Sequence, residues 1–159
     1  MKIKIIKAKK ENYKEVGFLF DLYRQFYKYK TEIKKSTKYI RERISKKEST
    51  IFLCYCDKEP AGFVQLYETF DSLNINKKLV LYDLYVKKEF RQIGIGKSLM
   101  DIAKKFGHKK KIKLILFFKA KSLLLFIKIL PIPFFLNSLI TYKSYKTNFL
   151  LMFKESNVL

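Results

Sequence analysis

The sequence predicts a mixed α/β fold, in which helices flank one central sheet in the order β-α-α-β-β-β-α-β. Apolar residues alternate with polar ones in some short stretches, as in strands, and recur every three or four residues in others, as in helices. A strand, a glycine turn, a helix and another strand follow one another from residue 79 to 118, which predicts parallel strands with a right-handed crossover. With 159 residues and 48% hydrophobic content, one core is expected.

The N-terminal third predicts a strand and two helices. Ile3 and Ile5 alternate with lysines, as in a strand. Asn12 is placed to cap a helix, with Glu15 reaching back to it. The apolar positions of the first helix are Val16, Leu19, Phe20, Tyr23, Phe26 and Tyr27, and those of the second are Ile33, Thr37, Ile40 and Ile44.

The middle of the chain predicts three strands. "TIFLCYC" (50–56) reads as a buried strand, "DKEPAG" (57–62) as a hairpin turn, "GFVQLYETF" (62–70) as the returning strand and "DSLNINKK" (71–78) as a loop. Cys54 and Cys56 are expected to be small buried hydrophobes and not metal ligands. In "LVLYDLYV" (79–86), strict alternation would place Leu79, Leu81, Asp83 and Tyr85 on one face and Val80, Tyr82, Leu84 and Val86 on the other.

The stretch "FRQIGIGKSLMD" (90–101) contains a glycine turn that invites two interpretations. A nucleotide-binding P-loop would need glycine where Arg91 stands, five residues before Gly96, so we do not expect an NTPase. The backbone N–H groups from Gln92 to Gly96 could converge on one anion, such as a pyrophosphate, with Arg91 and Lys97 adding charge at the rim. Gly94 and Gly96 would permit positive φ and close approach. A plain strand-to-helix turn fits these residues equally well.

A helix and a strand are expected after the turn. The helix would turn Ile95, Leu99, Ile102, Ala103 and Phe106 inward and end at Gly107. "KIKLILFF" (111–118) reads as the next strand.

The stretch "LYDLYVKKEFRQIGIGKSLMDIAKKF" resembles the GNAT superfamily of acetyl-CoA-dependent N-acetyltransferases, whose motif joins a strand, Arg/Gln-x-x-Gly-x-Gly/Ala and an amphipathic helix. "GFLFDLYRQFY" and "PAGFVQLYETF" are similar to the preceding family elements, so that the resemblance covers about residues 1–112. It implies a splayed sheet, acetyl-CoA as cosubstrate, no metal, and direct attack on the thioester by a primary amine of a small molecule or peptide.

The resemblance also implies roles for individual residues. Backbone groups of Leu84 and Val86 would hold the pantetheine arm. The strand itself, not the resemblance, supplies the candidate base: Asp83 is an acidic residue in an otherwise apolar strand and would act directly or through a water, although a structural aspartate bonded to loop amides is the alternative. The pyrophosphate would be held by Arg91, Gln92, Ile93, Gly94, Ile95, Gly96 and Lys97. Weaker candidates are Glu68 as base, Tyr67 and Tyr85 as lining of the acceptor cleft, and His108, which we expect to be a solvated residue at a helix end.

The net charge of +21 is weak evidence for nucleic-acid binding. Only four of the 35 basic residues are Arg, and the abundance of Lys, Ile, Phe, Tyr and Asn is typical of A/T-rich coding sequence. Readers of nucleic acid favour Arg forks in organised patches, so nucleic-acid binding is not expected as the main function. The first residues do not resemble a signal peptide, which indicates a cytoplasmic protein. A homodimer stays open.

Residues 113–159 depart from the family pattern. No acidic residue occurs from 102 to 154, and the family's last helix, with its Leu-Tyr-Glu, is missing. Three lysines and two prolines interrupt the apolar stretch, which argues against a transmembrane span; these are Lys119, Lys121, Lys128, Pro131 and Pro133. We interpret the change as a reading-frame shift near codons 108–118. The alternatives to an active enzyme are a non-catalytic acyl-CoA-binding remnant and a basic protein associated with membranes or nucleic acid.

Overall fold

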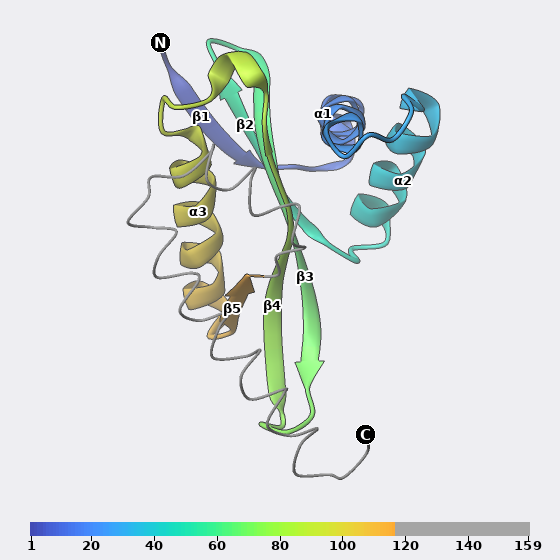
Figure 1. Cartoon of the computed structure of the whole chain (residues 1–159). Coiled ribbons are helices and arrows are strands. Elements are labelled where there is room, and N and C mark those ends of the chain that lie inside the picture. Colours follow the sequence, from blue (N-terminus) through green and yellow to red (C-terminus); the bar gives the residue numbers. More distant parts are fainter. Residues whose placement is uncertain (117–159) are drawn as a thin grey trace, which may run out of the picture.

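The computed structural model describes residues 1–116. They form one five-stranded sheet in the order β1-β2-β3-β4-β5, antiparallel except for the parallel pair β4 and β5. Helices α1 and α2 lie on one side of the sheet and α3 on the other (Figure 1). The elements are β1 (Ile3–Lys7), α1 (Tyr13–Phe26), α2 (Ile33–Ser45), β2 (Thr50–Cys56), β3 (Glu59–Asp71), β4 (Asn76–Val86), α3 (Ile95–Lys110) and β5 (Lys113–Leu116). The predicted fold class and element order are confirmed.

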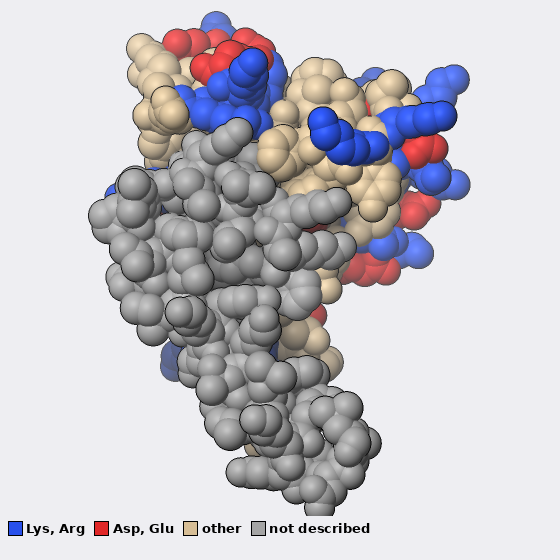
Figure 2. Space-filling model, in the orientation of Figure 1, with Lys and Arg blue, Asp and Glu red and all other residues tan. Residues whose placement is uncertain are grey.

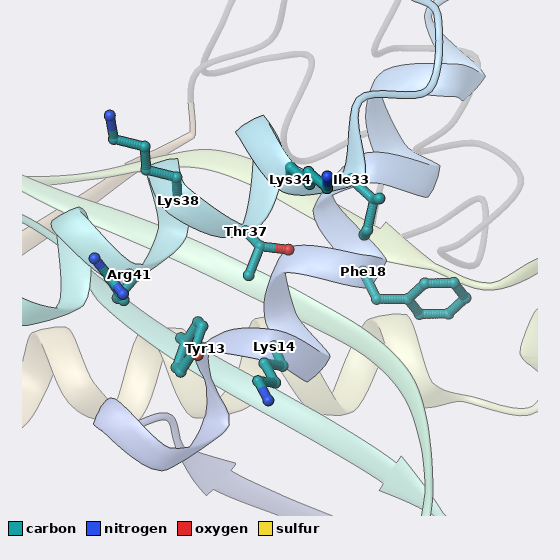
Figure 3. A pocket seen from close by; sticks show the side chains of 8 residues that line it. All are labelled: Tyr13, Lys14, Phe18, Ile33, Lys34, Thr37, Lys38 and Arg41. Atoms are coloured by element: carbon teal, nitrogen blue, oxygen red, sulfur yellow. The ribbon is translucent and has the colours of Figure 1, made fainter.

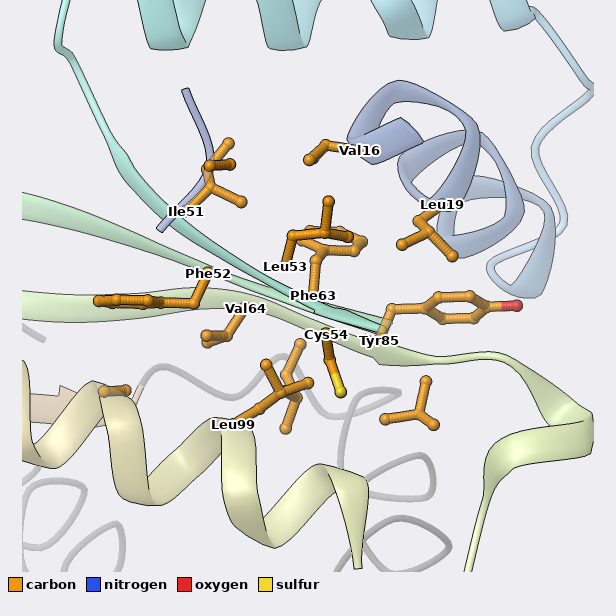
Figure 4. Packing of buried hydrophobic residues seen from close by; sticks show 14 of the residues in the cluster. Val16, Leu19, Ile51, Phe52, Leu53, Cys54, Phe63, Val64, Tyr85 and Leu99 are labelled. Carbon is orange, nitrogen blue, oxygen red and sulfur yellow. The ribbon is translucent and has the colours of Figure 1, made fainter. Parts of the chain in front are cut away.

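The core fills both sides of the sheet. Figure 4 shows Leu53 and Phe63 directed toward α1, whereas Cys54 and Val64 point toward Leu99 of α3. Both cysteine thiols, those of Cys54 and Cys56, are free and buried, as predicted. No helix within residues 1–116 is long and apolar enough to cross a membrane. The predictions for 117–159, including the frame shift, lie outside the described residues.

Two turns are tighter than the sequence predicts. Only Asp57 and Lys58 separate β2 from β3; both have positive φ, 46° and 75°, which suits a two-residue hairpin. The expected loop 71–78 shrinks to residues 72–75. There the Asp71 carboxylate accepts a hydrogen bond from Asn74 Nδ2 at 2.7 Å and pairs with Lys78 Nζ at 2.6 Å. These side-chain contacts close a turn that lacks both glycine and proline.

A β-bulge in β4 changes which side of the sheet its residues face. Gln65 pairs with Asp83 but the next residue of β3, Leu66, pairs with Leu81, so Tyr82 is an extra residue in β4. Successive side chains of a strand normally point to opposite faces of the sheet. Because of the extra residue, the side chains before the bulge alternate in the opposite sense to those after it.

The predicted faces of β4 are therefore wrong for its first half. Leu79 lies beside Gly107 of α3, whereas Asp83 is hydrogen-bonded to Tyr23 of α1. Since residues paired across strands share a face, the register places four residues of β4 toward α3: Leu79, Leu81, Leu84 and Val86. All four are buried.

Two predicted helix ends also differ. Asn12 is the N-cap residue of α1, and Glu15 reaches back to it as predicted, accepting a hydrogen bond from its Nδ2 at 3.3 Å. The side chain of Asn12 does not cap the helix, however, because its Oδ1 accepts instead from Lys9 N at 3.0 Å. Helix α3 does not end at Gly107 but continues to Lys110, and Lys111 takes the left-handed conformation instead. Gly107 packs closely inside the helix, since a Cβ there would lie 3.0 Å from the carbonyl oxygen of Ile112.

A buried carboxylate joins α1 to α2. Asp21 is 3% exposed and accepts four hydrogen bonds, from Gln25 Nε2 (2.9 Å), Thr31 Oγ1 (2.7 Å), Glu32 N (2.9 Å) and Ser36 Oγ (2.8 Å). Burial opposes ionisation, but the four hydrogen bonds outweigh it and lower the pKa of Asp21 from 3.8 to about 2. The α1–α2 connection is thus fixed by one charge.

We expect Asp21 to make stability pH-dependent in acid. Its folded pKa lies below its unfolded pKa, so its contribution is complete above about pH 5 and is lost as pH falls through about 2. The shift corresponds to about 2 kcal/mol. Urea unfolding between pH 2 and 7 should show that Asp21→Asn has a lower free energy of unfolding than wild type at neutral pH. Its free energy should also fall less steeply as the pH is lowered, so that the acid limb of the curve is flatter. The exposed change Glu11→Gln serves as control; an acid limb unaltered in Asp21→Asn would contradict the assignment.

Candidate functional site

The glycine turn starts from an anchored residue at the end of β4. Lys87 donates its backbone N–H to Ala61 O at 2.9 Å, and its Nζ contacts Glu59 and lies 2.7 Å from Glu89 Oε1. Burial of this ammonium opposes its charge, but the hydrogen bonds to both carboxylates outweigh burial and raise the pKa of Lys87. The turn therefore leaves the sheet from a fixed position.

Two residues of the turn adopt left-handed backbone conformations. They are Gln92, with φ of 65°, and Gly94, with φ of 88°. Gly96 does not use a positive φ; it is buried in the first turn of α3. The prediction that both glycines permit positive φ thus holds only for Gly94. The second residue with positive φ is Gln92, and its residue type does not predict that conformation.

The N-terminus of α3 is left without a side-chain cap. Gly94 is its N-cap residue and has no side chain to supply one, while its carbonyl accepts hydrogen bonds from Ser98 N at 3.0 Å and Ser98 Oγ at 3.1 Å. The first N–H groups of a helix have no partner within the helix, and the helix dipole is positive there. Lys97 adds an exposed ammonium, 3.3 Å from Asp101 Oδ2. This arrangement can hold an anion.

Arg91 points back toward the sheet. Its Nε donates to the carbonyl of Val86 at 2.9 Å, and its guanidinium carbon lies 5.7 Å from the ring centroid of Phe26 and 5.8 Å from that of Tyr85. Arg91 therefore ties the turn to β4 and to α1, a structural role that its place in the motif did not predict.

The end of β4 is closely packed on one side. A Cβ at Gly62 of β3 would lie 2.6 Å from the carbonyl oxygen of Tyr85, so only glycine fits there. Toward its other neighbour, β4 pairs with β5 only from Lys78 to Leu81, within the part of the chain that the structure describes. Leu84 and Val86 lie beyond that pairing, next to the turn.

Asp83 lies among tyrosines on the opposite face of β4 from α3. It is half-buried, next to the bulge, and hydrogen-bonded to Tyr23 of α1. Burial, and then the charge of Asp83, raise the pKa of the Tyr23 hydroxyl. Burial also raises the pKa of Tyr67, whose hydroxyl lies 3.0 Å from that of Tyr39 and accepts a hydrogen bond from Gln65 Nε2 at 2.9 Å. Helical spacing predicts that Tyr23 faces inward, but not that it reaches Asp83.

The weaker candidates are scattered. Glu68 pairs with Lys110 at the far end of α3, and His108 is exposed on the same helix. Tyr85 is buried against Tyr23, with ring centroids 6.2 Å apart. Two hollows of about 580 Å³ each lie away from the glycine turn, one between α1 and α2 and one beside Glu68.

Comparisons with known proteins agree on the class. The family model described as "Acetyltransferase (GNAT) family" matches residues 16–122. A Bacillus subtilis relative, the uncharacterized N-acetyltransferase YhfO, is 31% identical over 103 residues, which are 65% of this chain and 69% of the relative. A crystal structure of a probable acetyltransferase superposes with a TM-score of 0.70 at 28% identity, over 78% of this chain and 85% of that one. A predicted acetyltransferase from Clostridium acetobutylicum, crystallised with acetyl-CoA, shares the fold at 12% identity and a TM-score of 0.63, over 75% and 82% of the two chains.

The two glycines next to the turn should respond differently to alanine. Gly62→Ala must push β3 away from β4 and should cost about 1–3 kcal/mol of unfolding free energy. At Gly94 a Cβ would meet no described atom within 4 Å, so Gly94→Ala should cost only the left-handed strain, about 1 kcal/mol. Urea unfolding of both variants measures the difference. Equal losses would show that the tight contact at Gly62 has been misjudged.

Proposed function

Because the chain belongs to the GNAT acetyltransferase family, we propose that it transfers an acetyl group from acetyl-CoA to a primary amine of a small molecule or peptide. One observation carries the proposal beyond family membership: in the connection that follows β4, the left-handed Gly94 opens a helix N-terminus that has no side-chain cap. Such a terminus offers several N–H groups to one anion, and the diphosphate of coenzyme A is an anion of that kind. A cytoplasmic location stays a prediction.

We assign the parts of coenzyme A to residues next to the turn. Backbone groups of Leu84 and Val86 would pair with the pantetheine amides; the support for this assignment is their position at the end of β4, next to the glycine turn. The Val86 carbonyl already accepts a hydrogen bond from Arg91, so Arg91 would act chiefly by fixing the turn. The diphosphate would be held by the backbone N–H groups of Gln92, Ile93, Gly94, Ile95, Gly96 and Lys97.

In the proposed reaction the amine nitrogen attacks the thioester carbonyl carbon. A C–N bond forms, the C–S bond breaks, and the thiolate leaves with a proton from a general acid. The amine must lose a proton, and Asp83 is our candidate to receive it, directly or through a water. Its support is its position: a carboxylate beside the bulge, half-buried, with Tyr23 as a hydrogen-bond partner that orients it.

Acetyl-CoA should stabilise the protein. At 100 times its dissociation constant a ligand adds about 2.7 kcal/mol, which a thermal melt would detect. Acetyl-CoA and CoA should both raise the melting temperature, since both carry the diphosphate. A shift without thiol release from an amine panel would indicate the non-catalytic remnant. If only an oligonucleotide raises the melting temperature, and the shift decreases with added salt, nucleic-acid binding would be favoured and the proposal refuted.

Asp83→Asn should separate chemistry from binding. Without the base, turnover should fall by about 10²–10⁴-fold, while the melting shift with acetyl-CoA persists. The exposed carboxylate change Glu11→Gln, before α1, is the control and should leave turnover unchanged. Thiol release measured from pH 6 to 9 gives the readout; wild-type turnover in Asp83→Asn would end its role as base.

A further inference from the structure

The outer side of the α1–α2 pair carries a groove that the proposed reaction does not use. Both helices bury other residues, such as Leu19 and Ile40, in the core. A Cβ at Gly17 of α1 would lie 2.7 Å from the Cα of Thr37 in α2, so the helices touch at that point. The groove encloses about 580 Å³ and, as Figure 3 shows, is lined by Tyr13, Lys14, Phe18, Ile33, Lys34, Thr37, Lys38 and Arg41.

One end of the groove is apolar and exposed. Phe18 is 45% exposed and Ile33 is 44% exposed, and Figure 3 shows them at the same end of the groove, one from each helix. Single exposed apolar residues are common on protein surfaces, but a pair at the end of a groove offers an anchoring point for a partner. Ile33 belongs to the apolar positions expected for the second helix, but unlike Ile40, which is buried, it lies on the surface.

The rest of the groove is basic. Lys14, Lys34, Lys38 and Arg41 line it, and none of the eight lining residues is acidic. Figure 2 shows acidic side chains on this part of the surface as well. The acidic groups of the two helices have other contacts: Glu15 accepts from Tyr55 OH at 2.6 Å, Asp21 is buried, Glu32 pairs with Arg24 at 2.6 Å, and Glu42 lies 3.8 Å from Arg43. The groove therefore favours a negatively charged occupant.

We propose that this groove docks an acidic amphipathic helix of a partner protein. From Ile33 to Arg41 it follows nine residues of α2, a rise of about 12 Å, which is about two helical turns. A third helix could place apolar side chains at i and i+3 over Phe18 and Ile33, with carboxylates on both flanks and in the next turn facing the basic residues. The concave shape between two helices suits a rod better than a flat membrane surface. No residue of the glycine turn lines the groove, so the proposal is independent of acyl transfer.

A labelled peptide tests the proposal on the full chain. The probe is a fluorescein-tagged helix of about 18 residues with a leucine stripe flanked by glutamates, and its control is a scramble of equal composition without the stripe. Fluorescence anisotropy should show saturable binding of the probe and at least about tenfold weaker binding of the scramble. Equal binding of both peptides would reduce the effect to net charge and overturn the proposal.

Matched variants locate the binding. Lys34→Glu with Lys38→Glu, and separately Phe18→Ser, should weaken the probe at least about tenfold. The control Lys105→Glu with Lys109→Glu alters two exposed lysines of α3 by the same charge and should change binding less than about twofold. The midpoint of urea unfolding should stay within about 0.5 M of the wild type in all of them, which verifies folding. Equal loss in the control, or groove-dependent binding to phosphatidylglycerol vesicles but not to the probe, would overturn the proposal.

Discussion

The register between β3 and β4 is the constraint on which the rest of the described structure depends. One extra residue, Tyr82, allows β4 to bury leucines against α3 at both of its ends and still present Asp83 to α1. Without the bulge, either Leu79 or Leu84 would face the wrong layer. Beyond the bulge the strand continues to Val86, where the close fit at Gly62 and the anchored Lys87 fix the origin of the glycine turn. The sheet thus fixes the position from which the glycine turn starts.

The sequence predicted the elements well because their patterns are local. Alternation and helical spacing depend on neighbouring residues, and β2 was found to the residue. What failed depends on contacts between distant residues. The bulge shows only in the pairing of β4 with β3, and the turn at Asp71 is closed by Lys78, not by glycine.

In the candidate site, too, local features could be predicted from the sequence and contacts between distant residues could not. The glycine turn and the strand before it could be found from spacing, because a backbone anion site needs particular residues in a row. The roles of single side chains could not. Arg91 reads as a charge for the ligand but contacts Val86 and two aromatic rings, and Asp83 reads as isolated in an apolar strand but lies beside Tyr23. Those relations join α1 to β4, and no local pattern encodes them.

The unusual occupants of the tight turns have a cost that falls on the whole fold. Seven residues other than glycine have positive φ within 1–116: Lys28, Lys47, Asp57, Lys58, Ile75, Gln92 and Lys111. Each side chain in that conformation is disfavoured by about 1 kcal/mol relative to glycine. Four of the seven are lysines: Lys28, Lys47, Lys58 and Lys111. Because every one of the seven keeps a Cβ where glycine would be free of strain, their costs add up and lower the free energy of unfolding of the whole fold.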